Sequence, residues 1–213
     1  MISWGRPELH FIYGAMGSAK TAHLLLSSHH FLEKGVSTCI VVPSIDTRVR
    51  KGSVESRAGM KSTAAVVCQR QKIADAIGGT AALQKIGAIF ADEANFLSVK
   101  QVDELASIVD NLGIPVFAYG IRTDFRTKFF PGTRRLMEIA DRITEMDSLC
   151  PCGRKAVVNA RYFGSRIFRK GPQILVGGNE SYMALCRKCW KAGNIPKTKR
   201  GLNMATFIPV TTI

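Results

Sequence analysis

The sequence predicts an α/β fold, in which a parallel β-sheet is covered by helices and is followed by a small second domain. Short apolar runs alternate with helical patterns as far as Tyr119, and this alternation is typical of parallel sheets with helices on both faces. Near Asp147 the pattern changes to paired cysteines and short strands. We therefore expect three parts: residues 1–147, residues 148–190 and a basic tail at 191–213.

The elements of the first part follow in a regular order. A strand at Glu8–Tyr13 leads through a glycine-rich loop into a helix at Thr21–Lys34, and Gly35 ends that helix. Further strands are predicted at 36–42, 64–68, 86–91 and 114–119, with helices at about 70–83 and 98–112. Cys39 and Cys68 lie in two of these strands, so we expect both to be buried. The polar segment 43–63 is long for a loop within a compact domain, which indicates a functional or mobile segment.

Composition and charge exclude several classes of protein. The chain has 213 residues, of which 46% are hydrophobic, so dominant disorder is excluded. No apolar run approaches the roughly 18 residues of a membrane helix, and Arg6 and Glu8 stand where a secretion signal would be apolar. We therefore expect a cytoplasmic location. The net charge of +14 indicates phosphate-bearing partners, either nucleotides or nucleic acid.

The glycine-rich loop has the setting of a phosphate-binding loop, between a strand and a helix. Its residues are Gly14, Ala15, Met16, Gly17, Ser18, Ala19, Lys20 and Thr21. In such a loop the backbone N–H groups surround phosphates, Lys20 adds charge and the Thr21 hydroxyl faces Mg²⁺. Ala19 stands where the pattern G-x-x-x-x-G-K-[ST] has glycine, and alanine fits there if its φ is negative. The motif favours a P-loop (RecA-like) sheet over an ordinary glycine-rich turn.

Two acids end a buried strand at Asp92 and Glu93. Ionised carboxylates are costly there unless they serve a cation or accept a proton. Asp92 is suited to Mg²⁺ through water, and Glu93 to the acceptor side of a transferred phosphate. The alternative is that the pair only caps the following helix.

The segment Gly120–Arg126 follows another buried strand, and we expect it beside the acid pair at the same sheet edge. The aromatic residues Phe125, Phe129 and Phe130 lie near arginines, and we expect them to be exposed. Such rings suit a flat base next to phosphates. The alternative is a second small core beneath a loop.

The second part contains two cysteine pairs with short strands around 156–161 and 173–176 between them. Cys186-x-x-Cys189 has zinc-knuckle spacing, and Cys150-x-Cys152 supplies two further thiolates. Four thiolates form a closed structural Zn²⁺ site. The one-residue spacing of the first pair leaves open whether both of its cysteines are ligands, and free or redox-active thiols are the alternative.

Together these motifs resemble the type II (cytosolic-type) thymidine kinase family over about Glu8 to Trp190. The most specific parts are GIRTDF, ILVGGNESY and the cysteine pairs that bracket the latter. The resemblance implies transfer of the γ-phosphoryl group of ATP to the 5′-hydroxyl of thymidine with Mg²⁺, giving dTMP and ADP in nucleotide salvage, with deoxyuridine as a candidate second acceptor. It also implies a homotetramer, feedback inhibition by dTTP, a structural Zn²⁺, and neither a membrane nor a nucleic-acid partner.

The resemblance also implies roles for individual residues. Lys20, Thr21, Asp46 and Asp92 match the ATP and Mg²⁺ side. The catalytic positions are Glu93 as general base, Arg48 against the γ-phosphate, and Lys20. The segment Val157–Glu180 matches a loop called the lasso, which zinc holds at its base. The positions matching the nucleoside pocket are Met16, Phe96, Ile121, Phe125, Phe130, Asn159 and Tyr182, with Gln173, Ile174, Leu175, Val176 and Gly177 of the lasso.

Three residues depart from the family pattern. Ala19 replaces glycine and Asn95 replaces glutamine, which bears on rate, while Asn159 replaces a threonine beside the thymine methyl group, which bears on base selectivity. Two other functions stay open. The +14 charge would suit a zinc-ribbon P-loop ATPase that binds nucleic acid, and Ala19 would suit a nucleotide-binding protein without phosphoryl transfer.

Overall fold

The computed structural model describes residues 7–45, 52–173, 182–193 and 195. Its centre is a six-stranded sheet in the order β5-β2-β6-β7-β1-β8, and every neighbouring pair is parallel. The strands are β1 (Leu9–Gly14), β2 (Thr38–Pro43), β5 (Ala65–Val67), β6 (Ala88–Ala91), β7 (Val116–Gly120) and β8 (Arg142–Met146). The predicted α/β fold is thereby confirmed.

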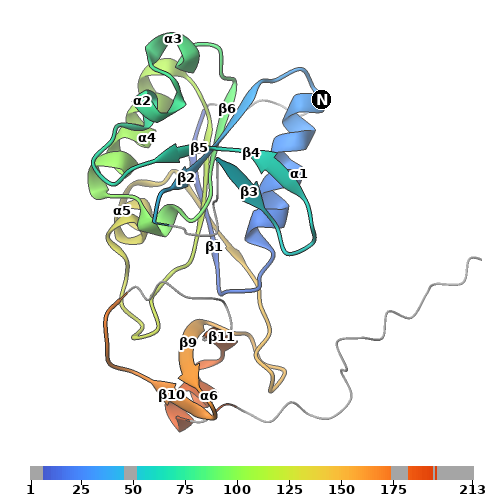
Figure 1. Cartoon of the computed structure of the whole chain (residues 1–213), viewed down its shortest axis with the longest axis vertical. Helices are drawn as coiled ribbons and strands as arrows, with labels where there is room; N and C mark the ends of the chain where they lie inside the picture. Colours follow the sequence, from blue (N-terminus) through green and yellow to red (C-terminus); the bar gives the residue numbers. More distant parts are fainter. Residues whose placement is uncertain (1–6, 46–51, 174–181, 194, 196–213) are drawn as a thin grey trace, which may run out of the picture.

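Helices cover both faces of the sheet, as Figure 1 shows. They are α1 (Lys20–Glu33), α2 (Ile73–Ile77), α3 (Thr80–Leu83), α4 (Val99–Leu112), α5 (Pro131–Ile139) and the 3₁₀ turn η1 (Ala94–Phe96). Neighbouring residues of β1 point to opposite faces, so Ile12 packs with Leu24 of α1, whereas Phe11 packs in the cluster that contains Leu105 of α4. Apolar side chains on both faces explain why the inner strands of the sheet are mostly apolar rather than alternating.

A smaller module lies at one end of the sheet (Figure 1). It contains an antiparallel sheet in the order β10-β9-β11 and a short helix. These elements are β9 (Val158–Phe163), β10 (Arg166–Phe168), β11 (Tyr182–Leu185) and α6 (Arg187–Ala192). We call residues 148–193, as far as they are described, the cysteine module.

Several local expectations were wrong. The helix expected at 70–83 is divided into α2 and α3, because Gly78 and Gly79 adopt φ values of 111° and 87°. Cys39 is half-buried and Cys68 is exposed, since β5 ends at Val67 and the chain leaves the sheet there.

Other elements had not been predicted. The segment 43–63 contains a hairpin of β3 (Ser53–Glu55) and β4 (Lys61–Thr63), and neither α5 nor β8 had been expected. Of the strand expected at 173–176, only Gln173 is among the described residues. In the described part of the chain, no helix has the length and apolar character needed to cross a membrane.

Candidate functional site

The three loops predicted to carry the chemistry lie side by side at the carboxyl ends of the sheet strands. The P-loop follows β1, the acid pair follows β6, and the segment that begins at Gly120 follows β7. Strand β7 lies between the other two, paired in parallel with each. The carboxyl ends of parallel strands are where α/β proteins bind ligands. The expected proximity of these loops is confirmed.

The P-loop depends on glycine at two positions and carries strain at a third. A Cβ on Gly14 would lie 2.5 Å from the Met146 carbonyl oxygen, so only glycine fits there. Gly17 has a φ of +78°, which glycine adopts readily. Ala19 also lies in the left-handed region, at φ 59° and ψ 23°. The condition under which alanine would fit is therefore not met, and the residue carries strain of about 1–2 kcal/mol.

Lys20 is folded against the loop that precedes it. Its side chain donates to the carbonyl oxygens of Ala15 at 2.9 Å and Gly14 at 3.2 Å, and to the Ser18 hydroxyl at 3.2 Å. Lys20 itself is 9% exposed. The loop thus holds a buried cation at its centre, where an anionic group would find an opposite charge.

The acid pair links this loop to β6. Asp92 is buried and accepts a hydrogen bond of 2.9 Å from the Thr21 hydroxyl. Glu93 adopts a φ of 47°, and strained conformations of non-glycine residues of this kind gather at functional sites. The Glu93 side chain does not cap η1, and Ser98 with Gln101 forms the capping box of α4. The capping alternative for Glu93 is therefore not supported.

The loop after β7 is built around a buried carboxylate. Asp124 is 2% exposed, forms an ion pair of 2.7 Å with Arg126, and accepts from the backbone N–H groups of Arg126 and Lys128. Its hydrogen-bonding capacity is used within the loop. Asp124 therefore shapes the turn that places Phe125.

The expectation that all three phenylalanines are exposed was wrong for two of them. Phe125 is 1% and Phe130 4% exposed, whereas Phe129 is 43% exposed. Phe130 meets the edge of the Phe96 ring at a centroid distance of 5.3 Å, and the guanidinium of Arg161 lies 3.8 Å from the Phe125 ring centroid. Each buried ring thus has a specific partner from another segment.

Sequence reasoning missed Arg161. Its side chain is 7% exposed and donates to the Tyr182 hydroxyl at 2.8 Å, the Pro172 carbonyl oxygen at 3.0 Å and the Gln173 carbonyl oxygen at 3.4 Å. One guanidinium therefore covers Phe125 and joins the two chain segments that flank residues 174–181. The signal was an arginine next to Ala160 in the short run VVNARY, most of which forms β9.

The four predicted cysteine ligands converge in the cysteine module. The sulfur atoms of Cys150, Cys152, Cys186 and Cys189 all lie within 4.8 Å of one another, and none is in a disulfide. Cys152 Sγ lies 3.4 Å from Cys150 Sγ and 3.7 Å from Cys186 Sγ. A tetrahedral ion with bonds of about 2.3 Å to sulfur requires separations of about 3.8 Å.

Both members of the first cysteine pair belong to this cluster. The backbone N–H of Arg154 lowers the pKa of Cys152 to about 7, whereas burial raises the pKa of Cys150 and of Cys189. A bound cation would favour the thiolate form of all of them. Cys186 Sγ also accepts from the Cys189 N–H at 3.5 Å, which resembles a zinc knuckle. The cluster fits a structural metal ion.

Comparison with known proteins assigns the chain to a family. A family model described as thymidine kinase matches residues 7–190. The chain is 40% identical over 185 residues to a thymidine kinase of Ruegeria pomeroyi, covering 86% of this chain and 93% of that protein. It is 40% identical over 182 residues to that of Shewanella oneidensis, covering 85% and 95% of the two chains. It is 41% identical over 185 residues to that of Enterobacteria phage T4, covering 86% and 95%. The chain belongs to the thymidine kinase family.

Two of the residues predicted for the nucleoside pocket are linked to Phe125 or to the loop that carries it. Tyr182 reaches it through Arg161, and Gln173 donates its side-chain amide to the Phe129 carbonyl oxygen at 3.4 Å. Ile121 is fixed next to the acid pair, since its N–H donates to Asn95 Oδ1 at 3.0 Å. Six predicted site residues lie outside the described residues: Asp46, Arg48, Ile174, Leu175, Val176 and Gly177.

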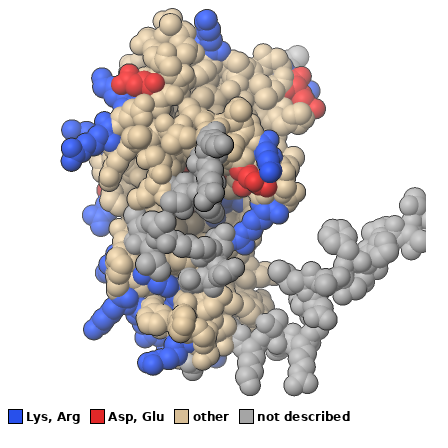
Figure 2. Space-filling view, viewed as in Figure 1, with Lys and Arg blue, Asp and Glu red and all other residues tan. Residues whose placement is uncertain are grey.

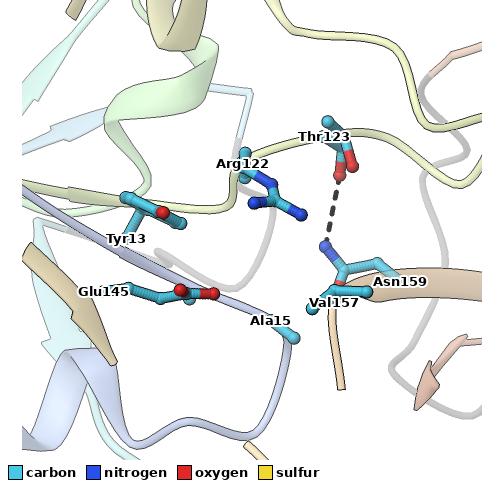
Figure 3. Close-up of a pocket in the computed structure, with 8 residues that line it drawn as sticks. Tyr13, Ala15, Arg122, Thr123, Glu145, Val157 and Asn159 are labelled. Carbon is cyan, nitrogen blue, oxygen red and sulfur yellow. Dashed lines mark hydrogen bonds between the residues drawn. The ribbon is translucent and has the colours of Figure 1, made fainter. Parts of the chain in front are cut away.

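The remaining two predicted nucleoside positions meet each other. Asn159 accepts a hydrogen bond of 2.7 Å from the N–H of Met16 and donates one of 3.2 Å to the Thr123 carbonyl oxygen. Figure 3 shows the amide of Asn159 pointing toward Thr123 across a small pocket that Arg122 and Glu145 also line. Asn159 thus connects the P-loop, through Met16, with the loop after β7, through Thr123.

Proposed function

We propose that this protein transfers the γ-phosphoryl group of ATP to the 5′-hydroxyl of thymidine, giving dTMP and ADP. The observation that carries the proposal is the order of three loops on one sheet edge. The loop after β7, which carries Phe125, lies between the P-loop after β1 and the acid pair after β6. Phosphoryl transfer needs a donor site, a base and an acceptor site in contact, and membership of the thymidine kinase family supports this reading of the three loops.

On the donor side, Lys20 and the P-loop backbone would bind the phosphates. The Thr21 hydroxyl and the Asp92 carboxylate, 2.9 Å apart, are oxygen ligands of the kind that Mg²⁺ prefers. Bound there, Mg²⁺ would neutralise charge on the phosphate oxygens. When ATP binds, the Lys20 ammonium would exchange its carbonyl contacts for phosphate oxygens, which are stronger acceptors.

On the acceptor side, Glu93 would accept the proton of the 5′-hydroxyl, and Phe125 would stack on the thymine ring. The guanidinium groups of Arg161 and Arg126 lie 3.8 Å and 5.6 Å from the Phe125 ring centroid, so a base would need a face of the ring that neither group covers. Since Phe125 is only 1% exposed, nucleoside binding must displace a neighbouring group from that face. We expect this rearrangement to accompany thymidine binding.

Replacing Glu93 tests the assignment of the base. Glu93→Gln should lower kcat by roughly 10²–10⁴, the usual range for a lost general base, because the amide cannot accept the proton. Steady-state phosphorylation of thymidine measures the effect. Glu138→Gln on α5 is the control, because Glu138 is half-exposed in an ion pair with Arg135. Unchanged turnover in Glu93→Gln would remove Glu93 from this role.

A nucleic-acid-dependent ATPase is the second candidate, and the charge of the cysteine module favours it. The described residues of this module include nine Lys and Arg and lack Asp and Glu. Figure 2 shows many Lys and Arg side chains on the lower part of the molecule, where this module lies. Such a surface would suit a phosphate backbone.

One assay separates the two functions. ADP release is measured with thymidine, deoxyuridine, deoxycytidine or single-stranded DNA as the single added acceptor. Release that depends on thymidine supports the kinase, and release that depends on DNA overturns it.

We also propose that Zn²⁺ occupies the cysteine cluster, that the protein is a cytoplasmic homotetramer and that dTTP inhibits it. Metal analysis, light scattering and the same assay with added dTTP test these points.

A further inference from the structure

Both hydrogen bonds of the Asn159 side chain are made to residues outside the cysteine module. Asn159 lies on β9 and is 4% exposed. Its Oδ1 accepts from the N–H of Met16 at 2.7 Å, and its Nδ2 donates to the Thr123 carbonyl oxygen at 3.2 Å. Met16 belongs to the P-loop, and Thr123 directly precedes Asp124 and Phe125. One buried amide therefore joins the loop of the donor side to the loop of the acceptor side.

The contact with Met16 also reaches Lys20 through a single peptide group. The N–H of the Ala15–Met16 peptide is bound by Asn159, and its carbonyl oxygen accepts from the Lys20 ammonium at 2.9 Å. A peptide group is planar, so fixing the direction of the N–H also fixes the direction of the carbonyl. Asn159 therefore sets the orientation of the carbonyl on which the Lys20 ammonium rests.

The P-loop has further contacts with the cysteine module at the same place. Ala15 is part of the apolar cluster that contains Cys150, Ala160 and Leu185. The Ser148 hydroxyl donates to the Met16 carbonyl oxygen at 3.4 Å. The module thus contacts the loop through apolar packing and through hydrogen bonds on both sides of Met16. Among these contacts, the 2.7 Å bond from Met16 to Asn159 is the shortest polar one.

We propose that Asn159 is a positioning residue that holds the P-loop in the conformation that binds the triphosphate and keeps it in register with the loop that carries Phe125. Removing the amide takes away the acceptor of the Met16 N–H at a half-buried site, which favours another orientation of the peptide. The nature of the two ligands rests on the proposed function. The positioning role requires no contact between Asn159 and the reacting atoms.

Asn159→Leu removes both hydrogen bonds and keeps the same number of side-chain heavy atoms. We expect amide hydrogen exchange in a peptide that covers Met16 to become at least about tenfold faster, since a bond of about 1.4 kcal/mol corresponds to a tenfold change. The affinity for a non-hydrolysable ATP analogue with Mg²⁺, measured by calorimetry without nucleoside, should fall by about the same factor. Asn159→Thr, which retains a shorter acceptor and suits a strand, should have a smaller effect and serves if the leucine variant does not fold.

Gln101→Leu is the matched control. Gln101 is also a buried amide that donates to backbone carbonyl oxygens, those of Cys68 and Gln71, but it lies on α4 away from the P-loop. This control should speed exchange near α4 and leave both the exchange at Met16 and the affinity for the ATP analogue unchanged. If Asn159→Leu acted only by lowering overall stability, the two variants would change the exchange at Met16 and the affinity for the ATP analogue to the same extent.

The outcomes separate this inference from the proposed function. A folded Asn159→Leu protein with unchanged ATP-analogue affinity and unchanged exchange at Met16 overturns the positioning role. The positioning role is also overturned if Gln101→Leu and Asn159→Leu, compared at an equal loss of thermal stability, lose equal affinity for the ATP analogue. If the wild-type protein binds the ATP analogue but neither binds nor phosphorylates thymidine, the proposed function fails, while the exchange and ATP-analogue measurements still decide the role of Asn159.

Discussion

Ala19 gives the P-loop a strained residue at the start of α1. Its φ of 59° costs an alanine about 1–2 kcal/mol, whereas glycine pays about 0.5–1 kcal/mol of additional chain entropy on folding. We therefore expect Ala19→Gly to raise the free energy of unfolding by about 0.5–1 kcal/mol, measured by urea denaturation.

The neighbouring turn of α1 provides the control for Ala19. Ala22 lies inside the helix, where glycine is unfavourable by about 1 kcal/mol, so Ala22→Gly should be destabilising. Opposite signs at the two positions would show that backbone strain, rather than a general effect of glycine, sets the result. A destabilising Ala19→Gly would mean that surrounding contacts already compensate the left-handed conformation.

A single residue, His10 on β1, should make the stability of the fold depend on pH. Its Nε2 lies 2.8 Å from the Thr144 hydroxyl, and burial lowers its pKa to about 4, with the charge of Arg142 and that of His23 as lesser causes. The unfolded chain has a histidine pKa near 6.5. The stability contributed by neutral His10 is therefore complete above about pH 6.5 and is lost as the pH falls toward 4.

A substitution isolates this contribution. His10→Gln keeps a polar side chain opposite Thr144 but does not titrate, so its free energy of unfolding should fall less between pH 6.5 and 4 than that of the wild-type protein. Urea denaturation at a series of pH values measures both. Other titrating groups, including the cysteines, are common to the two proteins and cancel in the difference. Parallel curves would contradict the assignment to His10.

At the scale of the elements, local patterns predicted what local chemistry determines. The alternation of strands and helices, the P-loop and the two cysteine pairs are all short-range signals, and the structure confirms them. The helix expected at 70–83 failed because adjacent glycines at 78 and 79 divide it, which was readable from the sequence. The strand β8 has mostly exposed side chains, so it lacked the apolar run by which the other strands were found.

Two features of the site that the sequence did not predict depend on contacts between distant segments. Asn159 binds Met16 across 143 positions of the chain, and Arg161 meets Tyr182 across 21. No periodicity or spacing encodes such a pair. Phe125 was expected to be exposed because nothing near it in the sequence shows that an arginine from β9 will cover its ring. The burial of Phe125 therefore depends on how the cysteine module packs on the sheet.

At the scale of the whole molecule, this packing links the cysteine cluster, where we propose Zn²⁺, to the P-loop, where we propose the phosphates of ATP. Ala15 of the P-loop shares an apolar cluster with Cys150 and Cys186, two of the four cysteines that converge. Structural metal sites contribute directly to the folding of small modules. The cysteine module has few buried apolar residues of its own, so loss of the ion should loosen it and, with it, the surface on which the P-loop rests.

We therefore expect removal of the metal to weaken ATP binding without unfolding the sheet. A chelator selective for Zn²⁺ over Mg²⁺ should release about one ion per chain, detected by mass spectrometry. The affinity for a non-hydrolysable ATP analogue should then fall at least about tenfold, while the far-ultraviolet circular dichroism of the helices persists. Cys186→Ser should have the same effect without a chelator.

Cys68→Ser is the control for this experiment, because Cys68 is exposed and lies outside the cluster. That variant should retain both metal and nucleotide affinity, which separates loss of the cluster from a general effect of removing a thiol. Loss of the ion with unchanged affinity for the ATP analogue would mean that the P-loop keeps its shape without the cysteine module. In that case the contacts to Ala15 and Met16 would stabilise the module rather than the loop, and the dependence between the two parts would run in the opposite direction.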